Sequence, residues 1–354
     1  MITAAKFVGL GMNAIPERTP EQLPLRLEYQ LNQVQDEVSA ITAVVRPILL
    51  STLYALKQEA VADAGGYEQI KLRQLARVYR AGDGDCGLSF EYAVHDALER
   101  NDPVVTQKVA DALTNHVRMN GLQTSSILFG AEKTGALQII DTAKDRLTDD
   151  SILLHGSKGR PAKLRRHIDS IAAAFRKSQV REQLPWSING LWKADLFVGY
   201  SDSDRWVGTT VKVNKAMLEG ARGLRIGIVP ARSGDTDLIQ RDENKNLIVC
   251  PLPYDGSFMQ VFYQGWNVVK QVLAYDAELP PEAAIQRGPE RIVAGYLVDR
   301  RDHSVLDLLD VMQNVSQPQL LRTQAQVADI STRGAAQSLT AGAVVSPVAR
   351  LVDD

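Results

Sequence analysis

The sequence contains very little cysteine. Only Cys86 and Cys250 occur in 354 residues, and neither belongs to a CxxC pair or has a histidine companion at metal-binding spacing. A disulfide framework and a structural zinc site are therefore not indicated. This composition suits a reducing compartment, and we expect a cytoplasmic protein.

An excess of positive charge and a long apolar run are also missing. The 40 basic and 42 acidic residues give a formal net charge of -2, so a nucleic-acid partner would have to be held by local basic patches. No segment approaches about 18 consecutive apolar residues, and the N-terminus has no cationic leader followed by a long apolar stretch. We expect neither export nor a membrane span.

Several catalytic and binding motifs are absent as well. The segment GSKGR lacks the GxxxxGK[ST] pattern of a phosphate-binding loop, and GDGD lacks the spacing of an EF-hand. The serines and cysteines have no G-x-S-x-G or Cys-His context, and the histidines form no cluster. An NTPase and a nucleophilic hydrolase are not supported.

Composition permits a folded chain of roughly two to three domains, with 45% hydrophobic and 23% charged residues. Residues 1–85 are predicted to be a helical N-terminal region, with Pro47 as a break. Residues 86–278 are predicted to form an α/β core with a mostly helical insertion at about 103–185. Residues 279–354 are predicted to be helical and to end in a loose tail from Ser331.

The pattern changes to β-rich after Pro185. The runs KADLFVGY and WVGTTVKVN, separated by the polar turn SDSDR, predict a hairpin. A short helix at 214–223 and a buried strand at 224–231 are expected to follow. A further β-rich stretch, NLIVCPLPYDGSFMQVFYQ, is expected to precede a helix at 265–275.

The hairpin places polar side chains on one face. Pairing its ends predicts that Asp195 lies opposite Lys212 and that Phe197 faces Thr210, and side-chain alternation puts all four on the same face. Phosphodiester hydrolysis needs a carboxylate that holds Mg²⁺ and a cation that orients water and offsets phosphate charge. Asp195 and Lys212 could supply both.

Asp195, a fourteen-residue spacer and Thr210-Val211-Lys212, followed by helix and strand, resemble the PD-(D/E)XK nuclease superfamily. The resemblance covers about residues 87–99 and 186–232. It implies an α/β fold with a restriction-endonuclease-like mixed sheet flanked by helices, here with helical additions at both ends. The motif residues would lie on adjacent strands of an αβββαβ core. Thr210 departs from the pattern, because it stands where a second metal-binding carboxylate belongs.

Members of this superfamily often carry a glutamate on the helix that opens the core. Glu91, near the start of a helix predicted to run from about Ser89 to Asn101, matches that place. The alternative is a solvated glutamate near a helix start, where its charge suits the helix dipole. His95, one turn later, is interpreted as a packing or surface histidine.

Basic residues gather just before the hairpin and could contact phosphates, although a basic helix is more often a solvated face. They are Lys158, Arg160, Lys163, Arg165, Arg166, Arg176 and Lys177. Asn214 and Lys215 extend the strand that carries Lys212 and could hold a phosphate together with Thr210. A helix cap is the alternative for Asn214.

These features predict a Mg²⁺- or Mn²⁺-dependent endonuclease acting on DNA, of the restriction or anti-phage defence kind that the resemblance implies. Asp195 and Glu91 would bind metal and Lys212 would position water. The helical N-terminal region would serve a homodimer or a partner protein. Two alternatives stay open: a catalytically degenerate nuclease fold that binds nucleic acid or a partner, and a structural or assembly protein.

Overall fold

The structure is a computed structural model of the whole chain. It describes residues 25–78, 86–129, 146–154, 161–184, 188, 194–220, 223–231, 236–254, 258–285 and 288–316. The chain divides into two compact units, Met1–Asp36 with Pro318–Asp354, and Glu37–Gln317. Nearly all described residues belong to the second unit, which contains the candidate site. The predicted tail from Ser331 lies outside the described residues.

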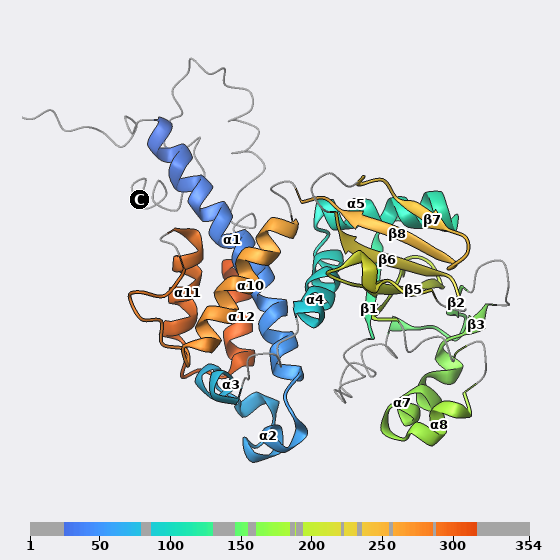
Figure 1. The fold of residues 1–354 in the computed structure, drawn as a ribbon, viewed down its shortest axis with the longest axis horizontal. Coiled ribbons are helices and arrows are strands. Elements are labelled where there is room, and N and C mark those ends of the chain that lie inside the picture. Colours follow the sequence, from blue (N-terminus) through green and yellow to red (C-terminus); the bar gives the residue numbers. More distant parts are fainter. Residues whose placement is uncertain are drawn as a thin grey trace, which may run out of the picture. The chain divides into compact units, whose positions relative to one another are not determined.

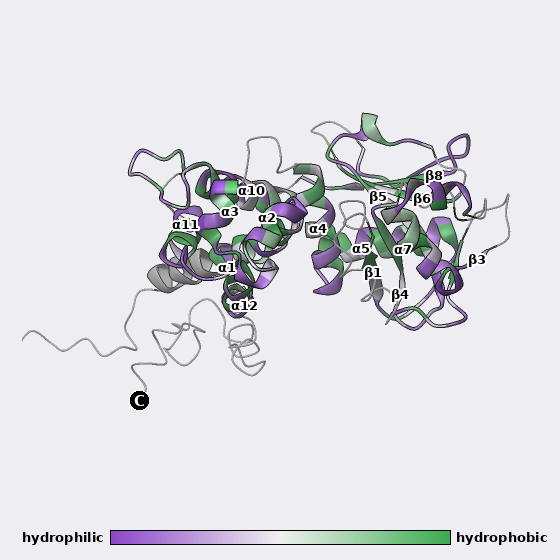
Figure 2. Ribbon diagram, turned by 90° about the horizontal axis from the view of Figure 1, so that it is seen from below, coloured by the Kyte–Doolittle hydropathy of each residue, from purple (hydrophilic) through white to green (hydrophobic). Residues whose placement is uncertain are grey.

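Helices from both ends of the sequence pack together in the second unit (Figure 1). They are the part of α1 (Leu25–Tyr54) from Glu37 onward, α2 (Gln58–Asp63), the 3-10 turn η2 (Tyr67–Gln69), α3 (Leu72–Val78), α10 (Phe258–Ala274), α11 (Pro289–Asp299) and α12 (Val305–Val315). Figure 2 shows both hydrophobic and hydrophilic residues along these helices, as expected for helices with one buried face. The helical character predicted for both ends is confirmed over the described residues.

The break predicted at Pro47 is wrong, because α1 runs through it. A proline inside a helix loses one backbone hydrogen bond. Here the flanking Val45 and Ile48 are fully buried, and this burial offsets the loss. The span Asp36–Tyr54 is long and apolar enough to cross a membrane, but 72% of its most apolar 18-residue stretch is buried inside the protein, as in a core helix.

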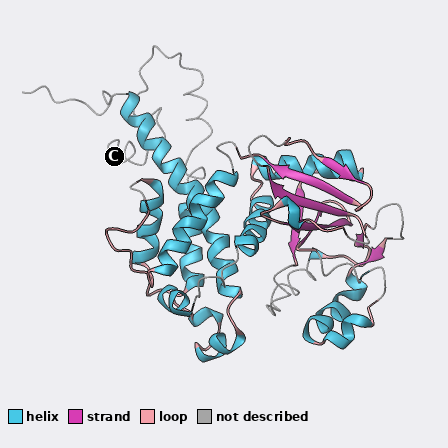
Figure 3. Cartoon of the chain, viewed as in Figure 1, coloured by secondary structure: helices cyan, strands magenta, loops and turns pink. Residues whose placement is uncertain are grey.

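The described strands form one mixed sheet of eight, flanked by helices (Figure 3). They are β1 (Thr124–Leu128), β2 (Ile152–Leu153), β3 (Ala162–Lys163), β4 (Leu196–Tyr200), β5 (Arg205–Val211), β6 (Arg225–Pro230), β7 (Gln240–Asp242) and β8 (Leu247–Leu252). The main order is β1-β4-β5-β6-β8-β7. β4 is antiparallel to β1 and β5, whereas β6 is parallel to β5 and β8. The predicted α/β class is confirmed.

The β4–β5 hairpin forms as predicted, but in a different register. Leu196 pairs with Thr209 and Phe197 with Gly208, so Asp195 is level with Thr210 and not with Lys212. The shift is two residues, and an even shift leaves every side chain on its predicted face. The turn sets this register, since β5 already begins at Arg205.

Residues 103–185 are less helical than predicted. Helix α5 (Pro103–Asp111), the π-helical turn η3 (Ala112–Val117), the 3-10 turn η5 (Arg165–His167), α7 (Ile168–Arg176) and α8 (Ser178–Glu182) are helical. Three strands, however, fall in this segment. The most important is β1, whose short sequence TSSIL has no clear alternation and becomes a strand by pairing with the fully buried β4.

Two further boundaries differ from the predictions. Only the 3-10 turn η7 (Lys215–Met217) forms in the described part of 214–223. Helix α10 begins at Phe258, so FMQVFY is helical and not part of a β-rich stretch. Its buried residues Phe258, Phe262 and Gly265 recur at the three- and four-residue spacing of a helix face.

The sheet is buried on both faces. Leu196, Val198 and Val207 join the main core with helix α4 (Cys86–Glu99) and the helices around α1 and α10. Phe197 and Trp206 point to the other face, where they join a second core with Ile127, Phe129, Leu147, Leu153, Ala162, Leu164, Ile168, Ile171, Ile188 and Ala194. Successive side chains of β4 therefore point alternately into the two cores.

Candidate active site at one end of the sheet

Asp195 and Lys212 lie at the same end of the hairpin. Asp195 directly precedes β4, and its N–H donates to the carbonyl of Thr209 at 2.8 Å. Lys212 directly follows β5, and its N–H donates to the carbonyl of Ile228 on β6 at 3.0 Å. Since β4 and β5 are antiparallel, the start of one meets the end of the other.

Glu91 completes the cluster from helix α4. The Lys212 ammonium Nζ donates to Asp195 Oδ2 at 2.8 Å and to Glu91 Oε1 at 3.1 Å. Lys212 therefore contacts both of the other residues proposed from the sequence as catalytic, although the three come from separate parts of the chain. The prediction that Asp195 and Lys212 face the same way is confirmed.

Asp195 is held by its neighbours on β5. Besides Lys212, its Oδ2 accepts the Thr210 hydroxyl at 2.8 Å and the Val211 N–H at 2.9 Å. Three donors on one oxygen fix the direction of the carboxylate. Thr210 thus donates a hydrogen bond at the place where the superfamily pattern has a second carboxylate.

The cluster is mostly buried, with Lys212 as its accessible member. Asp195 and Glu91 are 3% and 8% exposed, whereas the Lys212 side chain is 27% exposed. Burial lowers the pKa of Lys212, but the charges and hydrogen bonds of Glu91 and Asp195 outweigh it, so that the pKa is raised. Lys212 is consequently a cation at neutral pH.

No protein-family model, curated protein or solved structure matches this chain. What the site can do is therefore inferred from its own geometry and chemistry. Within the described ranges, no group of three or more His, Cys, Asp or Glu side chains is placed to hold a metal ion. Asp195 and Glu91 offer two carboxylates, linked through Lys212.

Arg225, at the start of β6, is a further charged residue near Asp195 that sequence reasoning missed. It is 3% exposed. Burial lowers its pKa to about 10, while the charge of Asp195 acts in the opposite direction. An arginine opening a buried strand is the signal that could have drawn attention to it, because a buried charge needs a nearby counter-charge.

The predicted basic strip is partly engaged in ion pairs. Lys163 Nζ lies 3.3 Å from Asp150, and Arg165 donates to the Leu147 carbonyl at 2.6 Å. Arg166 and Lys177 are exposed. Lys158 and Arg160 lie outside the described residues, as does the side chain of Arg176. Phosphate binding by this strip stays a prediction.

Asn214 and Lys215 follow the strand β5 that precedes Lys212. The Asn214 side chain accepts the Ala216 N–H at 3.0 Å and caps the turn η7. The capping interpretation therefore has direct support. Lys215 is exposed, and its phosphate-binding role stays a prediction.

His95 contacts β1 and not the Asp195 cluster. Its Nδ1 lies 2.6 Å from the Ser126 hydroxyl, and burial lowers its pKa. This agrees with the packing interpretation. Ser126 is fully buried, which also removes it as an accessible nucleophile.

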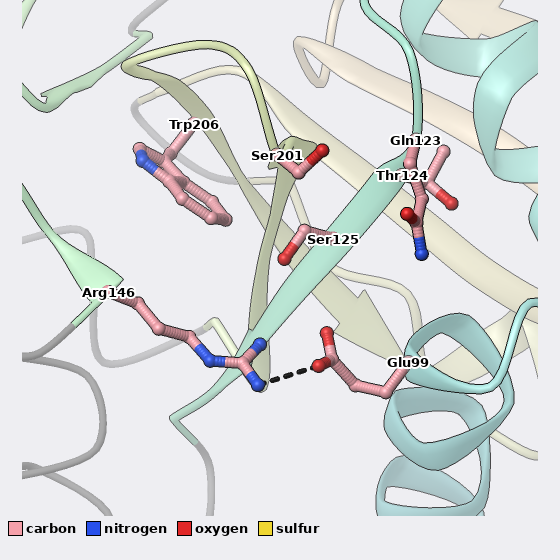
Figure 4. Close-up of a pocket in the computed structure, with 7 residues that line it drawn as sticks. All are labelled: Glu99, Gln123, Thr124, Ser125, Arg146, Ser201 and Trp206. Atoms are coloured by element: carbon pink, nitrogen blue, oxygen red, sulfur yellow. Dashed lines mark ion pairs between the residues drawn. The ribbon is translucent and has the colours of Figure 1, made fainter.

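A pocket of about 320 Å³ opens beside β1 (Figure 4). Its wall includes the Glu99–Arg146 ion pair at 2.6 Å and the ring of Trp206. The ion pair already has a structural task, because Glu99 accepts the Ser126 N–H at 3.1 Å and Arg146 donates to the Ser126 carbonyl at 2.9 Å. It thereby covers the outer edge of β1, an edge that would otherwise be open to pairing.

Proposed function

We propose that this chain is a metal-dependent endonuclease that hydrolyses DNA phosphodiester bonds with a PD-(D/E)XK-type site. The observation that carries the proposal is the contact of Lys212 with both Asp195 and Glu91. The order α4, β1, β4, β5 and β6, with β5 parallel to β6, adds support because it follows the αβββαβ core of that superfamily apart from its second helix. The restriction or defence setting stays a prediction.

The carboxylates fit a hard divalent cation. Mg²⁺ prefers oxygen ligands and usually keeps several waters, so that two protein carboxylates are enough. Asp195 and Glu91 bind the same ammonium at 2.8 and 3.1 Å, which places both carboxylates around one small volume. When bound, Mg²⁺ or Mn²⁺ would lower the pKa of a water and offset charge on the phosphate.

The residues of the chain have separate tasks. Asp195, oriented by Thr210 and Val211, would anchor the cation. Lys212 is the more exposed member, and its raised pKa keeps it a cation at neutral pH. It would therefore orient the attacking water and stabilise the negative charge that develops on the phosphate.

A plasmid-nicking assay with Mg²⁺ or Mn²⁺ tests the proposal. Asp195→Ala should abolish cleavage and metal binding. Lys212→Ala should reduce cleavage by roughly 10²–10³-fold while DNA and metal binding persist, because Asp195 and Glu91, which would hold the metal, are unchanged in this variant. Lys270→Ala, an exposed lysine on α10, is the control and should cleave as wild type does. Equal cleavage by all variants would eliminate the site.

One observation favours a second candidate, a catalytically degenerate nuclease fold that binds nucleic acid or a partner protein. Lys212 and Arg225 together place two positive charges against the two carboxylates of Asp195 and Glu91. The cluster is thus balanced without a metal. DNA binding by wild type with neither Mn²⁺ binding nor cleavage would favour this candidate.

A further inference from the structure

The side chain of Arg225 extends over strand β5 at Gly208, where no side chain blocks it. The two residues are paired in the parallel β5–β6 register. A Cβ built on Gly208 would lie 1.8 Å from Arg225 Nη1 and 3.0 Å from its Cζ. No side chain larger than hydrogen fits there while the guanidinium keeps its place.

The side chain of Arg225 lies on the same face of the sheet as Asp195. Gly208 also pairs with Phe197 on β4, and directly opposed residues share one face of a sheet. Asp195 precedes Phe197 by two positions and so lies on that same face. The electrostatic effect of Asp195 on Arg225 agrees with this placement.

The two cations of the cluster differ in accessibility. The Lys212 side chain is 27% exposed and can turn toward a phosphate, whereas Arg225 is 3% exposed. Lys212 cannot serve a substrate and neutralise Asp195 fully at the same time. Arg225 is placed to keep compensating that carboxylate.

We propose that Arg225 is a positioning residue for the Asp195 carboxylate and that Gly208 supplies the space its guanidinium requires. Arg225 holds the charge and direction of Asp195 while Lys212 exchanges partners. The role of Asp195 as a metal ligand rests on the proposed function. The crossing of Arg225 over Gly208 is independent of the proposed function.

A stability cycle tests the crossing without any activity. Gly208→Ala should lower the urea midpoint of wild type. In an Arg225→Ala background the same substitution should lower the midpoint much less, because the added methyl group no longer meets a guanidinium. Gly199→Ala is the matched control on the same hairpin, since its Cβ would lie 2.6 Å from the Arg205 carbonyl oxygen. It should cost the same in both backgrounds. An equal cost of Gly208→Ala in both would overturn the crossing.

Mn²⁺ titration of the folded protein tests the positioning. Arg225→Met should weaken Mn²⁺ binding by about 10–100-fold, as expected for a residue that supports a metal ligand, and Arg225→Lys should recover part of the loss. Unchanged affinity in Arg225→Met would overturn the role. If wild type binds no Mn²⁺ and cuts no DNA, the proposed function fails. The positioning role is then decided by a double-mutant cycle of Asp195→Asn and Arg225→Met in urea unfolding. Additive losses in the free energy of unfolding reject the positioning role, and non-additive losses support it.

Discussion

Lys212 links the two carboxylates of the candidate site. It contacts carboxylates from α4 and from the start of β4. Removing one partner from a buried ionic cluster leaves an uncompensated charge, which is far costlier than the net gain from forming the pair. A cation that enters the site must therefore take over carboxylate oxygens from Lys212, and this exchange links metal capture to the freeing of the lysine.

A carboxylate at position 210 should strengthen the proposed metal binding. Thr210→Glu adds an anionic oxygen ligand beside Asp195, so that Mn²⁺ affinity should rise in calorimetry. It also removes the hydroxyl that donates to Asp195, and we expect a loss of about 1–3 kcal/mol in the free energy of unfolding. Thr210→Val is the control, with the stability loss but no gain in affinity. A Glu variant that binds Mn²⁺ no better than Val would contradict the placement of residue 210.

At the scale of elements, helix α4 carries a polar stripe along the face that meets the sheet. Glu91, His95 and Glu99 recur every four residues and so lie on one side of the helix. They contact Lys212, the Ser126 hydroxyl and the Ser126 N–H respectively. The same helix therefore completes the candidate site with its first half and attaches the edge strand β1 with its second.

The α4–β1 contact should make stability depend on pH. Burial lowers the pKa of His95 below 6.5, against the opposing charges of Glu99 and Asp96 and with the help of Arg146. The unfolded chain then binds the proton more readily, so stability is present above about pH 6.5 and is lost as pH falls below it, by up to about 1.4 kcal/mol per pH unit. His95→Gln should lose this dependence in urea unfolding between about pH 7.5 and 5.5.

His116→Gln is the matched control for that experiment. It replaces a histidine on η3 for which no contact with β1 is described, and so controls for the exchange of histidine for glutamine itself. A slope that persists in His95→Gln would assign the pH dependence to other groups.

The segment around η5 and α7 supplies a test of DNA contact. Arg166→Ala removes an exposed cation and should reduce the slope of log K against log salt by about one counterion. Replacing Arg165 as well should reduce it by about two. Only the double variant should also lower thermal stability, because Arg165 donates to the Leu147 carbonyl. A salt slope unchanged in both variants would assign the strip to a solvated face.

At the scale of the whole molecule, one continuous core joins the helices to the sheet. It extends from Val38 on α1 to Met312 on α12 and includes Val198 and Ile226 from the strands. Close approach of α1 and α10 is part of this core. A Cβ on Gly265 of α10 would lie 2.5 Å from Val44 Cγ2 on α1, so the glycine allows the two helices to pack.

Two glycine substitutions should therefore change the free energy of unfolding in opposite directions. Gly265→Ala should destabilise the protein by about 1–3 kcal/mol through overpacking, in excess of the gain in helix propensity. Gly295→Ala on α11 meets no atom within 4 Å and should stabilise it by up to about 1 kcal/mol. Urea unfolding of both variants provides the measurement. Stabilisation by both would show that α1 and α10 are packed less closely.

Sequence by itself determined the parts that depend on local periodicity. The two-residue alternation of KADLFVGY and WVGTTVKVN specifies a hairpin and the shared face of Asp195 and Lys212, because a strand points successive side chains to opposite faces. The helical spacing around Glu91 likewise specifies α4. These features placed Asp195 and Lys212 on one face before any fold was known, whereas Glu91 was added by the resemblance to the superfamily.

Tertiary structure decided what depends on distant partners. The register of the hairpin differs by two residues because the turn, and not the chemistry of the site, sets it. Strand β1 forms since β4 offers it a buried neighbour, and α1 continues through Pro47 since the core surrounds it. Arg225 enters the cluster only because β6 lies beside Gly208. Each of these outcomes depends on burial and pairing between segments far apart in the chain, which local patterns do not encode.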